Sequence, residues 1–102
     1  MEYTWMTRTE IQKYVPEMER LNVSEVARSR RGFLYNYFKH GKSVRDKLVS
    51  SRPESDAEQY WGQRRHNFIK RHLAQYNENP TYRRYLALIA WAYMPRLKPR
   101  NY

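Results

Sequence analysis

The stretch Thr81-Tyr-Arg-Arg-Tyr-Leu-Ala-Leu-Ile-Ala-Trp-Ala-Tyr-Met94 is apolar on nearly every side when it is wound as a helix. A helix that is apolar all round normally forms the buried centre of a bundle. Asn79 can cap this helix, Pro80 suits its first position, and Pro95 stops it. We therefore predict a central helix over residues 81–94, followed by a basic tail.

A second helix is predicted over residues 56–76, opened by a capping box in Ser55-Asp-Ala-Glu58. Its apolar residues recur on one stripe at the helical spacing. They are Ala57, Trp61, Phe68, Ile69 and Tyr76.

Two polar residues, Arg65 and His72, lie on the same stripe. A cation that faces a core is costly unless it is paired and hydrogen-bonded. We expect Arg65 to pair with a carboxylate from another helix, Glu25 or Asp46; alternatively, the face is open and holds a partner's acid. His72 is interpreted as a core histidine whose hydrogen bonds are satisfied.

In the first half of the chain, the sequence patterns predict shorter helices. The capping box Thr7-Arg-Thr-Glu10 opens a helix over residues 8–14, which Pro16 interrupts or restarts. Residues 24–40 have a helical apolar spacing that ends at Gly41, and Ser29 could cap a new helix and split the segment near Arg28. Another capping box, Ser43-Val-Arg-Asp46, predicts a helix over residues 44–50.

These patterns predict an all-α fold, a compact bundle of four or five helices with extended N- and C-terminal arms. The 102 residues fit a single domain. Residues 1–6 have no helix signal and form the N-terminal arm, and residues 95–102 form the basic C-terminal tail. The longest apolar run is too short to cross a bilayer, so we predict no transmembrane segment and a soluble protein.

Positive charge is the main compositional feature. The chain has 20 Lys and Arg against 10 Asp and Glu, for a net charge of +10. Residues 1–25 carry net −2, with three basic and five acidic residues, so residues 26–102 carry net +12. Fourteen of the cations are arginines, whose planar guanidinium group matches phosphates and carboxylates. The partner should be anionic: a nucleic acid, an acidic protein surface or anionic lipid.

The candidate partner-binding residues are clustered cations with tyrosines among them. Basic residues are often only the solvated faces of helices, but here acidic residues are too few to balance them, which favours binding. Tyr35, Tyr60, Tyr82 and Tyr102 could add stacking surfaces. The candidates are Arg28, Arg30, Arg31, Arg64, Arg71, Arg83, Arg84, Arg96, Lys98 and Arg100.

Catalytic patterns are missing from the sequence. There is no Cys, and the histidines at 40, 66 and 72 lack the spacing of a helical metal pair. No carboxylate pair, nucleophile motif or Gly-rich phosphate loop is recognisable. We predict a non-enzymatic protein with no cofactor, no metal and no small-molecule substrate.

Three stretches together resemble a short basic domain of unassigned activity found in proteins of large double-stranded DNA viruses of algae and protists. They are Ser24-Glu-Val-Ala-Arg-Ser-Arg-Arg-Gly-Phe33, Tyr60-Trp-Gly-Gln-Arg-Arg-His-Asn-Phe-Ile-Lys-Arg-His-Leu-Ala-Gln75 and Asn79-Pro-Thr-Tyr-Arg-Arg-Tyr-Leu-Ala-Leu-Ile-Ala-Trp-Ala-Tyr93. The resemblance covers roughly two-thirds of the chain. It implies a viral setting and no catalytic residues.

In that setting a basic domain serves either the capsid or the genome. The leading hypothesis is a minor capsid or cement protein of the virion, which docks through arginines and tyrosines onto acidic surfaces of larger capsid proteins. Both terminal arms would then reach neighbouring subunits. The alternative is a sequence-nonspecific nucleic-acid-binding protein associated with the viral genome, located like the first in the virion or otherwise soluble inside the host cell.

Overall fold

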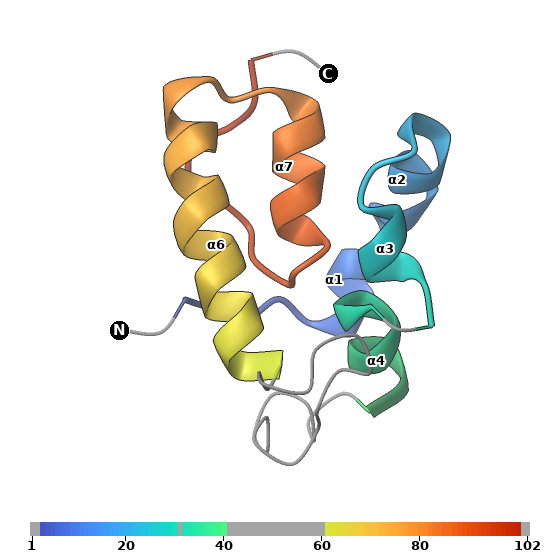
Figure 1. Ribbon diagram of the computed structural model, residues 1–102. Coiled ribbons are helices and arrows are strands. Elements are labelled where there is room, and N and C mark those ends of the chain that lie inside the picture. Colours follow the sequence, from blue (N-terminus) through green and yellow to red (C-terminus); the bar gives the residue numbers. More distant parts are fainter. Residues whose placement is uncertain (1–2, 31, 41–60, 101–102) are drawn as a thin grey trace.

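The structure is a computed structural model, and it describes residues 3–30, 32–40 and 61–100. These residues form an all-α bundle (Figure 1), which confirms the predicted fold class. Its helices are α1 (Arg8–Gln12), α2 (Val15–Leu21), α3 (Glu25–Arg28), α4 (Phe33–His40), α6 (Trp61–Glu78) and α7 (Tyr82–Ile89). The predicted helix over 44–50 and the two capping boxes that begin at Ser43 and Ser55 lie outside the described residues.

Helix α7 occupies the centre, as its apolar sequence predicted, with α6 on one side and α2 on the other (Figure 1). Tyr85, Leu86, Leu88 and Ile89 are buried on this helix. The core continues beyond the helix into residues 90–92, which are also buried. Burial of this one segment therefore organises the whole bundle.

The predicted length of the central helix is wrong, because α7 ends at Ile89 and not at Pro95. The Ala92 N–H donates to Ile89 O (2.9 Å), and the Tyr93 N–H donates to Leu88 O (3.2 Å). With Ala92 in the left-handed region (φ 61°), this is the pattern of a Schellman motif. A backbone turn between buried residues thus stops the helix before the proline is reached.

Two of the predicted helix starts can be compared directly with the structure. The Thr7–Glu10 capping box is present in α1, and α2 then begins with Pro16 in its first turn, so the predicted restart is confirmed. The predicted start of α7 is wrong. Thr81 caps this helix by accepting from the Arg84 N–H (3.2 Å), and Asn79 and Pro80 precede the cap.

Segment 24–40 is broken into two helices, as its sequence allowed. Ser29 ends α3, and α4 begins at Phe33, so Ser29 does not open the second helix. Gly32 lies at the break, where a Cβ atom would stand 2.0 Å from Val26 O and 2.3 Å from Ala27 O. Only glycine lets the chain pass this close to the end of α3.

Both terminal segments are extended, but their described parts are bound to the protein's own core. Met6 is buried, and its N–H donates to Ala92 O (2.8 Å) while Tyr37 Oη donates to Met6 O (2.7 Å). In the tail, Tyr76 Oη donates to Leu97 O (2.6 Å), and the Arg100 N–H donates to Pro80 O (2.8 Å). The described parts of the arms, residues 3–6 and 95–100, are thus held against the protein's own core, and their reach to neighbouring subunits stays a prediction.

Candidate functional site: the arginine-rich surface

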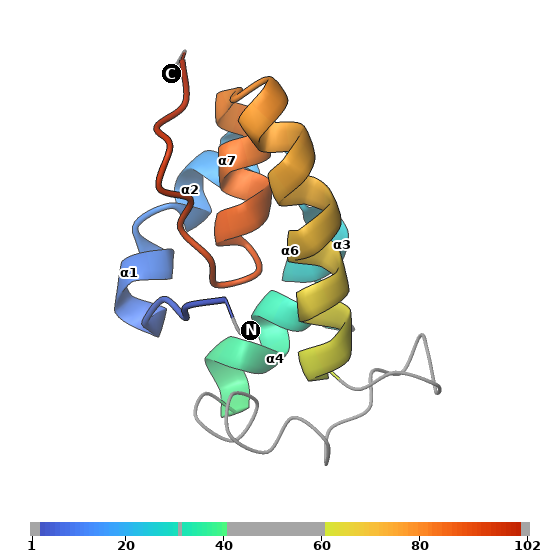
Figure 2. The same ribbon diagram turned by 90° about the vertical axis from the view of Figure 1, so that its left-hand side faces the viewer.

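Positive charge is concentrated in one region of the molecule. Residues 61–100 contain nine basic residues and a single acidic one, Glu78. Residues 3–30 and 32–40 hold six basic residues against four acidic ones, and one pair of these, Arg20 and Glu17, forms an ion pair (2.9 Å). The cationic region consists of α6, α7 and the tail, which lie together in Figures 1 and 2.

Arg65 is buried in this region, with 4 % of its surface exposed. Its guanidinium group donates to four backbone carbonyl oxygens, and its Cζ lies 3.8 Å from the centre of the Trp5 ring. Those acceptors are Trp91 O (2.8 Å), Ala92 O (3.0 Å), Tyr3 O (3.2 Å) and Thr4 O (2.6 Å). Arg65 therefore ties α6 to the N-terminal segment and to the turn after α7.

The carboxylate pairing that the sequence suggested stays a prediction where it involves Asp46. Glu25 is exposed on α3, and Asp46 lies outside the described residues. Carbonyl oxygens at the C-terminal end of a helix carry partial negative charge and lack intrahelical donors. The turn after α7 can therefore receive a buried guanidinium group, so Arg65 is a structural residue and not an open site for a partner's acid.

Four other arginines, nearer the surface, also donate to backbone carbonyls at helix ends. Each donates to a carbonyl in the last turn of a helix or just beyond it. Arg83 Nη1 bonds Leu21 O (2.6 Å) at the end of α2, Arg28 Nε bonds Val23 O (3.0 Å), Arg8 Nη1 bonds Phe38 O (3.1 Å) in α4, and Arg84 Nη1 bonds Asn79 O (3.1 Å) beyond α6. A carbonyl is neutral, so these bonds fix the guanidinium groups without cancelling their charge.

Three of the predicted site residues form what we call the arginine cluster, namely Arg71, Arg84 and Arg100. Arg84 and Arg100 both bond Asn79, Arg84 through the backbone oxygen and Arg100 Nη2 through the side-chain Oδ1. Arg71 is exposed on the C-terminal half of α6. The cluster thus combines α6, the start of α7 and the tail, three segments that are separate in the sequence.

The pKa of His72 depends in part on the positive charge of this cluster. Its ring is half-buried and stacks on Phe68, with 4.0 Å between ring centres. Burial lowers the pKa of His72 below its usual 6.5, and the positive charges of Arg71 and Arg84 lower it further. The prediction of a core histidine is right only in part, because one side of the ring belongs to the cationic surface.

The ten predicted site residues do not form one site. Arg96 and Lys98 are exposed on the tail, and Arg30 is exposed between α3 and α4. Arg83 bonds α2, and Arg64 is half-buried with other contacts. Arg31 lies outside the described residues. The arginine cluster is therefore the densest group of candidates that the structure brings together.

The predicted stacking tyrosines contribute little to this surface. Tyr82 is half-buried against Tyr85, and its hydroxyl donates to Glu17 Oε1 (3.3 Å), which joins α7 to α2. Tyr35 is exposed, but it lies on α4, away from the cluster. Tyr60 and Tyr102 lie outside the described residues. Among the described residues, the arginine cluster thus has few exposed rings beside it.

Two further features bear on the class of site. Within the described ranges, no group of three His, Asp or Glu residues could hold a metal ion. None of the helices in those ranges is long and apolar enough to span a membrane.

Comparison with family models, curated proteins and solved structures gives no match to this chain. The viral resemblance and the function it implies stay predictions.

Proposed function

We propose that this protein is a non-enzymatic docking protein that binds an acidic protein surface through the arginine cluster. In the viral setting that the sequence suggests, it would be a minor capsid or cement protein of the virion. Its partners would be larger capsid proteins with exposed carboxylates. This function needs no cofactor and no reaction, only a rigid scaffold that presents guanidinium groups.

The observation that carries the proposal is the way in which the arginines are held. Arg84 and Arg100 are anchored to Asn79 and keep their full charge. An arginine that is already ordered loses less side-chain entropy when it binds, and each such side chain otherwise costs about 0.5 to 1.5 kcal/mol. The cluster is thus preorganised for an anion.

A protein partner is favoured over single-stranded nucleic acid by the scarcity of exposed rings among the described residues at the cluster. Nonspecific binding of single strands relies on aromatic side chains on which bases stack. The exposed aromatic residue Tyr35 lies on α4, and Tyr82 is occupied by Glu17. Duplex DNA, contacted only at its phosphates, remains the second candidate because nine basic residues lie between 61 and 100.

The test uses two labelled probes, a polyglutamate peptide and a random-sequence DNA duplex, in fluorescence anisotropy titrations. We expect Arg84→Gln/Arg100→Gln to weaken polyglutamate binding about tenfold, which corresponds to about 1.4 kcal/mol. The matched control, Lys13→Gln/Lys39→Gln, has the same net charge of +8, or +10 minus two. It should bind nearly as the unmodified protein does, because its changes lie outside the cluster.

Two other outcomes of the titrations would contradict the docking proposal. Equal losses in both double variants would mean that overall charge binds the probe and that the cluster is not a site. Tight DNA binding that falls steeply between about 50 and 200 mM salt, with weak binding to polyglutamate, would identify the genome as the partner. In purified particles, the docking proposal also requires the protein to remain with the shell after the genome is removed.

A further inference from the structure

The C-terminal tail makes a bend between two prolines. Pro95 and Pro99 are both buried, whereas the three residues between them are exposed, and the chain bends at Arg96 and Leu97. Leu97, in the middle, is 47 % exposed. We call Arg96, Leu97 and Lys98 the tail bend. Its apolar centre thus lies between two cations.

The backbone of the tail bend is fixed by hydrogen bonds to the rest of the fold. Tyr76 Oη, in the last turn of α6, donates to Leu97 O (2.6 Å). The Arg100 N–H donates to Pro80 O (2.8 Å), just before α7. Both bonds involve the backbone of the tail, so they hold the bend in place without using the Leu97 side chain. The fold therefore does not explain why residue 97 is apolar.

The tail bend adjoins the arginine cluster. Arg100 of the cluster follows Leu97 by three residues, which span at most about 10 Å in an extended chain. Arg100 is bonded to Asn79, to which Arg84 is bonded as well. Residues 95–100 contain three cations and no acidic residue. One acidic partner can therefore contact Leu97 and the arginines together.

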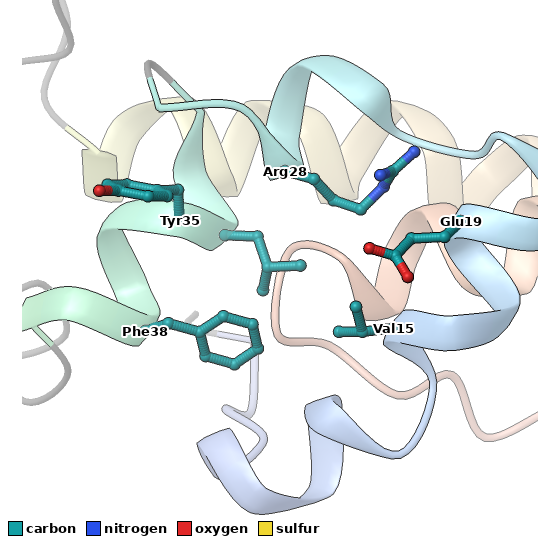
Figure 3. A pocket seen from close by; sticks show the side chains of 6 residues that line it. Val15, Glu19, Arg28, Tyr35 and Phe38 are labelled. Carbon is teal, nitrogen blue, oxygen red and sulfur yellow. The ribbon is translucent and has the colours of Figure 1, made fainter.

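A groove on another side of the molecule has a different character. It lies between α2, α3 and α4, with a volume of about 200 Å³ and apolar walls, and Tyr35 lies at one end (Figure 3). Its charged lining residues, Glu19 and Arg28, offset each other. Tyr35 and Val26, on α3, are the other large apolar residues exposed within the described ranges. The groove lining is thus neutral, whereas the apolar centre of the tail bend is flanked by positive charge.

We infer that Leu97 is the apolar contact of the docking surface, and that the acidic partner has an apolar site between its carboxylates. Leu97 packs against that site, while Arg96 and Lys98 face the carboxylates around it. A single exposed leucine is ordinary at a protein surface. Specific interfaces, however, combine an apolar centre with a polar rim, and the tail bend has this arrangement on a backbone that is already ordered.

This inference rests on the proposed function and narrows the class of partner. An acidic surface without apolar groups would engage the arginine cluster alone. The tail bend instead favours a surface in which acidic residues are interspersed with apolar or aromatic ones.

The experiment uses the full chain and two labelled probes of equal length, polyglutamate and a random copolymer of glutamate and tyrosine, in fluorescence anisotropy titrations. We expect Leu97→Ser to weaken binding to the copolymer about fivefold, because an apolar contact of about half a leucine side chain is lost. Binding to polyglutamate should be unchanged, since the charge is the same. Leu97→Met keeps an apolar side chain and should bind both probes like the unmodified protein.

Val26→Ser is the matched control. It also removes an exposed apolar side chain, but from α3, which lies on the opposite side of α7 from the tail (Figures 1 and 2). It should bind both probes like the unmodified protein. Circular dichroism verifies that every variant is folded.

Several results would overturn the inference. They are unchanged binding of the copolymer by Leu97→Ser, an equal loss with both probes, and an equal loss in Val26→Ser. A loss in Tyr35→Ser alone would place the copolymer in the groove and would also contradict it. None of these variants alters the arginine cluster, so the comparison of Arg84→Gln/Arg100→Gln with its own control still decides the proposed function separately.

Discussion

Helices α1 and α7 are both capped by a threonine, and they differ at the third helical residue. In both, a threonine accepts a hydrogen bond from the third helical N–H, at 3.2 Å from Thr7 in α1 and at 3.2 Å from Thr81 in α7. In α1 the third residue is Glu10, whose carboxylate accepts from the Thr7 N–H (2.9 Å). In α7 the third residue is Arg84, which bonds Asn79 O instead.

The difference shows that α7 lacks a stabilising interaction that α1 has. An acidic residue in the first turn stabilises a helix, and a basic one there opposes the helix dipole. Helix α7 has two arginines and no acidic residue in its first turn. Stability of the helix alone therefore does not explain the residue at position 84. This agrees with the proposal that Arg84 serves to bind a partner.

The largest effect on stability is expected from Arg65→Met, which tests whether a buried arginine stabilises the fold while an exposed cation does not. Four backbone oxygens lose a donor in the core, and each stranded acceptor costs about 1 to 3 kcal/mol. We expect the free energy of unfolding, measured in urea, to fall by about 3 kcal/mol or more. Lys70→Met, on the exposed face of the same helix, should change it by less than about 0.5 kcal/mol.

The two variants make the contrast testable in one experiment. If Arg65→Met melts like the unmodified protein, then the carbonyl bonds are not what holds residues 3–6 to the turn after α7. If it unfolds early while Lys70→Met does not, Arg65 holds the fold and an exposed cation on the same helix does not.

Much of the local structure could be predicted from short-range patterns. The Thr7–Glu10 box, the restart at Pro16 and the burial of Ile69 and Tyr76 on α6 depend on neighbours within a turn or two, and the structure has them as expected. The end of α7 could not be predicted. It depends on a left-handed Ala92 whose carbonyl accepts from Arg65 and Met6, both distant in the sequence.

The candidate site was only partly predictable for a related reason. Clusters of cations are visible in the sequence, but which helix ends they reach depends on how the helices pack. Arg83 bonds the end of α2, 62 residues away, and so joins two helices. The sequence nevertheless contains a signal for these arginine–carbonyl bonds. A chain with many helix ends has many unpaired carbonyls, and where acidic residues are few, arginines are left to cap these carbonyls.

An intermediate effect, of opposite sign for stability and for binding, is expected from Arg84→Glu. This change completes in α7 the Thr-x-x-Glu box that α1 already has. It also places a negative charge at the start of the helix, worth about 0.3 to 1 kcal/mol, although the bond to Asn79 O is lost. We expect equal or higher thermal stability together with weaker binding to polyglutamate.

The natural control is the reverse change, Glu10→Arg. It gives α1 the arrangement of α7 and should destabilise the protein by about 1 kcal/mol without affecting the cluster. Thermal melts of both variants, followed by circular dichroism, check the pair. Destabilisation by Arg84→Glu comparable to that of Glu10→Arg would show that Arg84 serves the fold, and would remove the argument that its charge is kept for a partner.

The smallest effect should be a pH dependence of stability that comes from His72. Its pKa is lowered in the folded protein, by burial first and then by Arg71 and Arg84. The unfolded chain therefore binds the proton more tightly, so stability falls as pH drops below 6.5 and levels off below the folded pKa. His72→Gln should flatten this part of the profile. Glu10 and Glu17, whose pKa values are lowered by hydrogen bonds to Thr7 and Arg20, act in a separate window below 4.5.

The same titration connects His72 to the cluster. An anion that binds near Arg71 and Arg84 offsets their charge, so it should raise the pKa of His72 towards its usual value. NMR titration of the His72 ring with and without the polyglutamate peptide measures this shift. The Arg84→Glu variant should show a raised pKa even without the peptide, because a repelling charge has been replaced by an attracting one. A His72 pKa that is the same in all three samples would mean that the peptide binds elsewhere and that Arg84 is too far away to act on this ring.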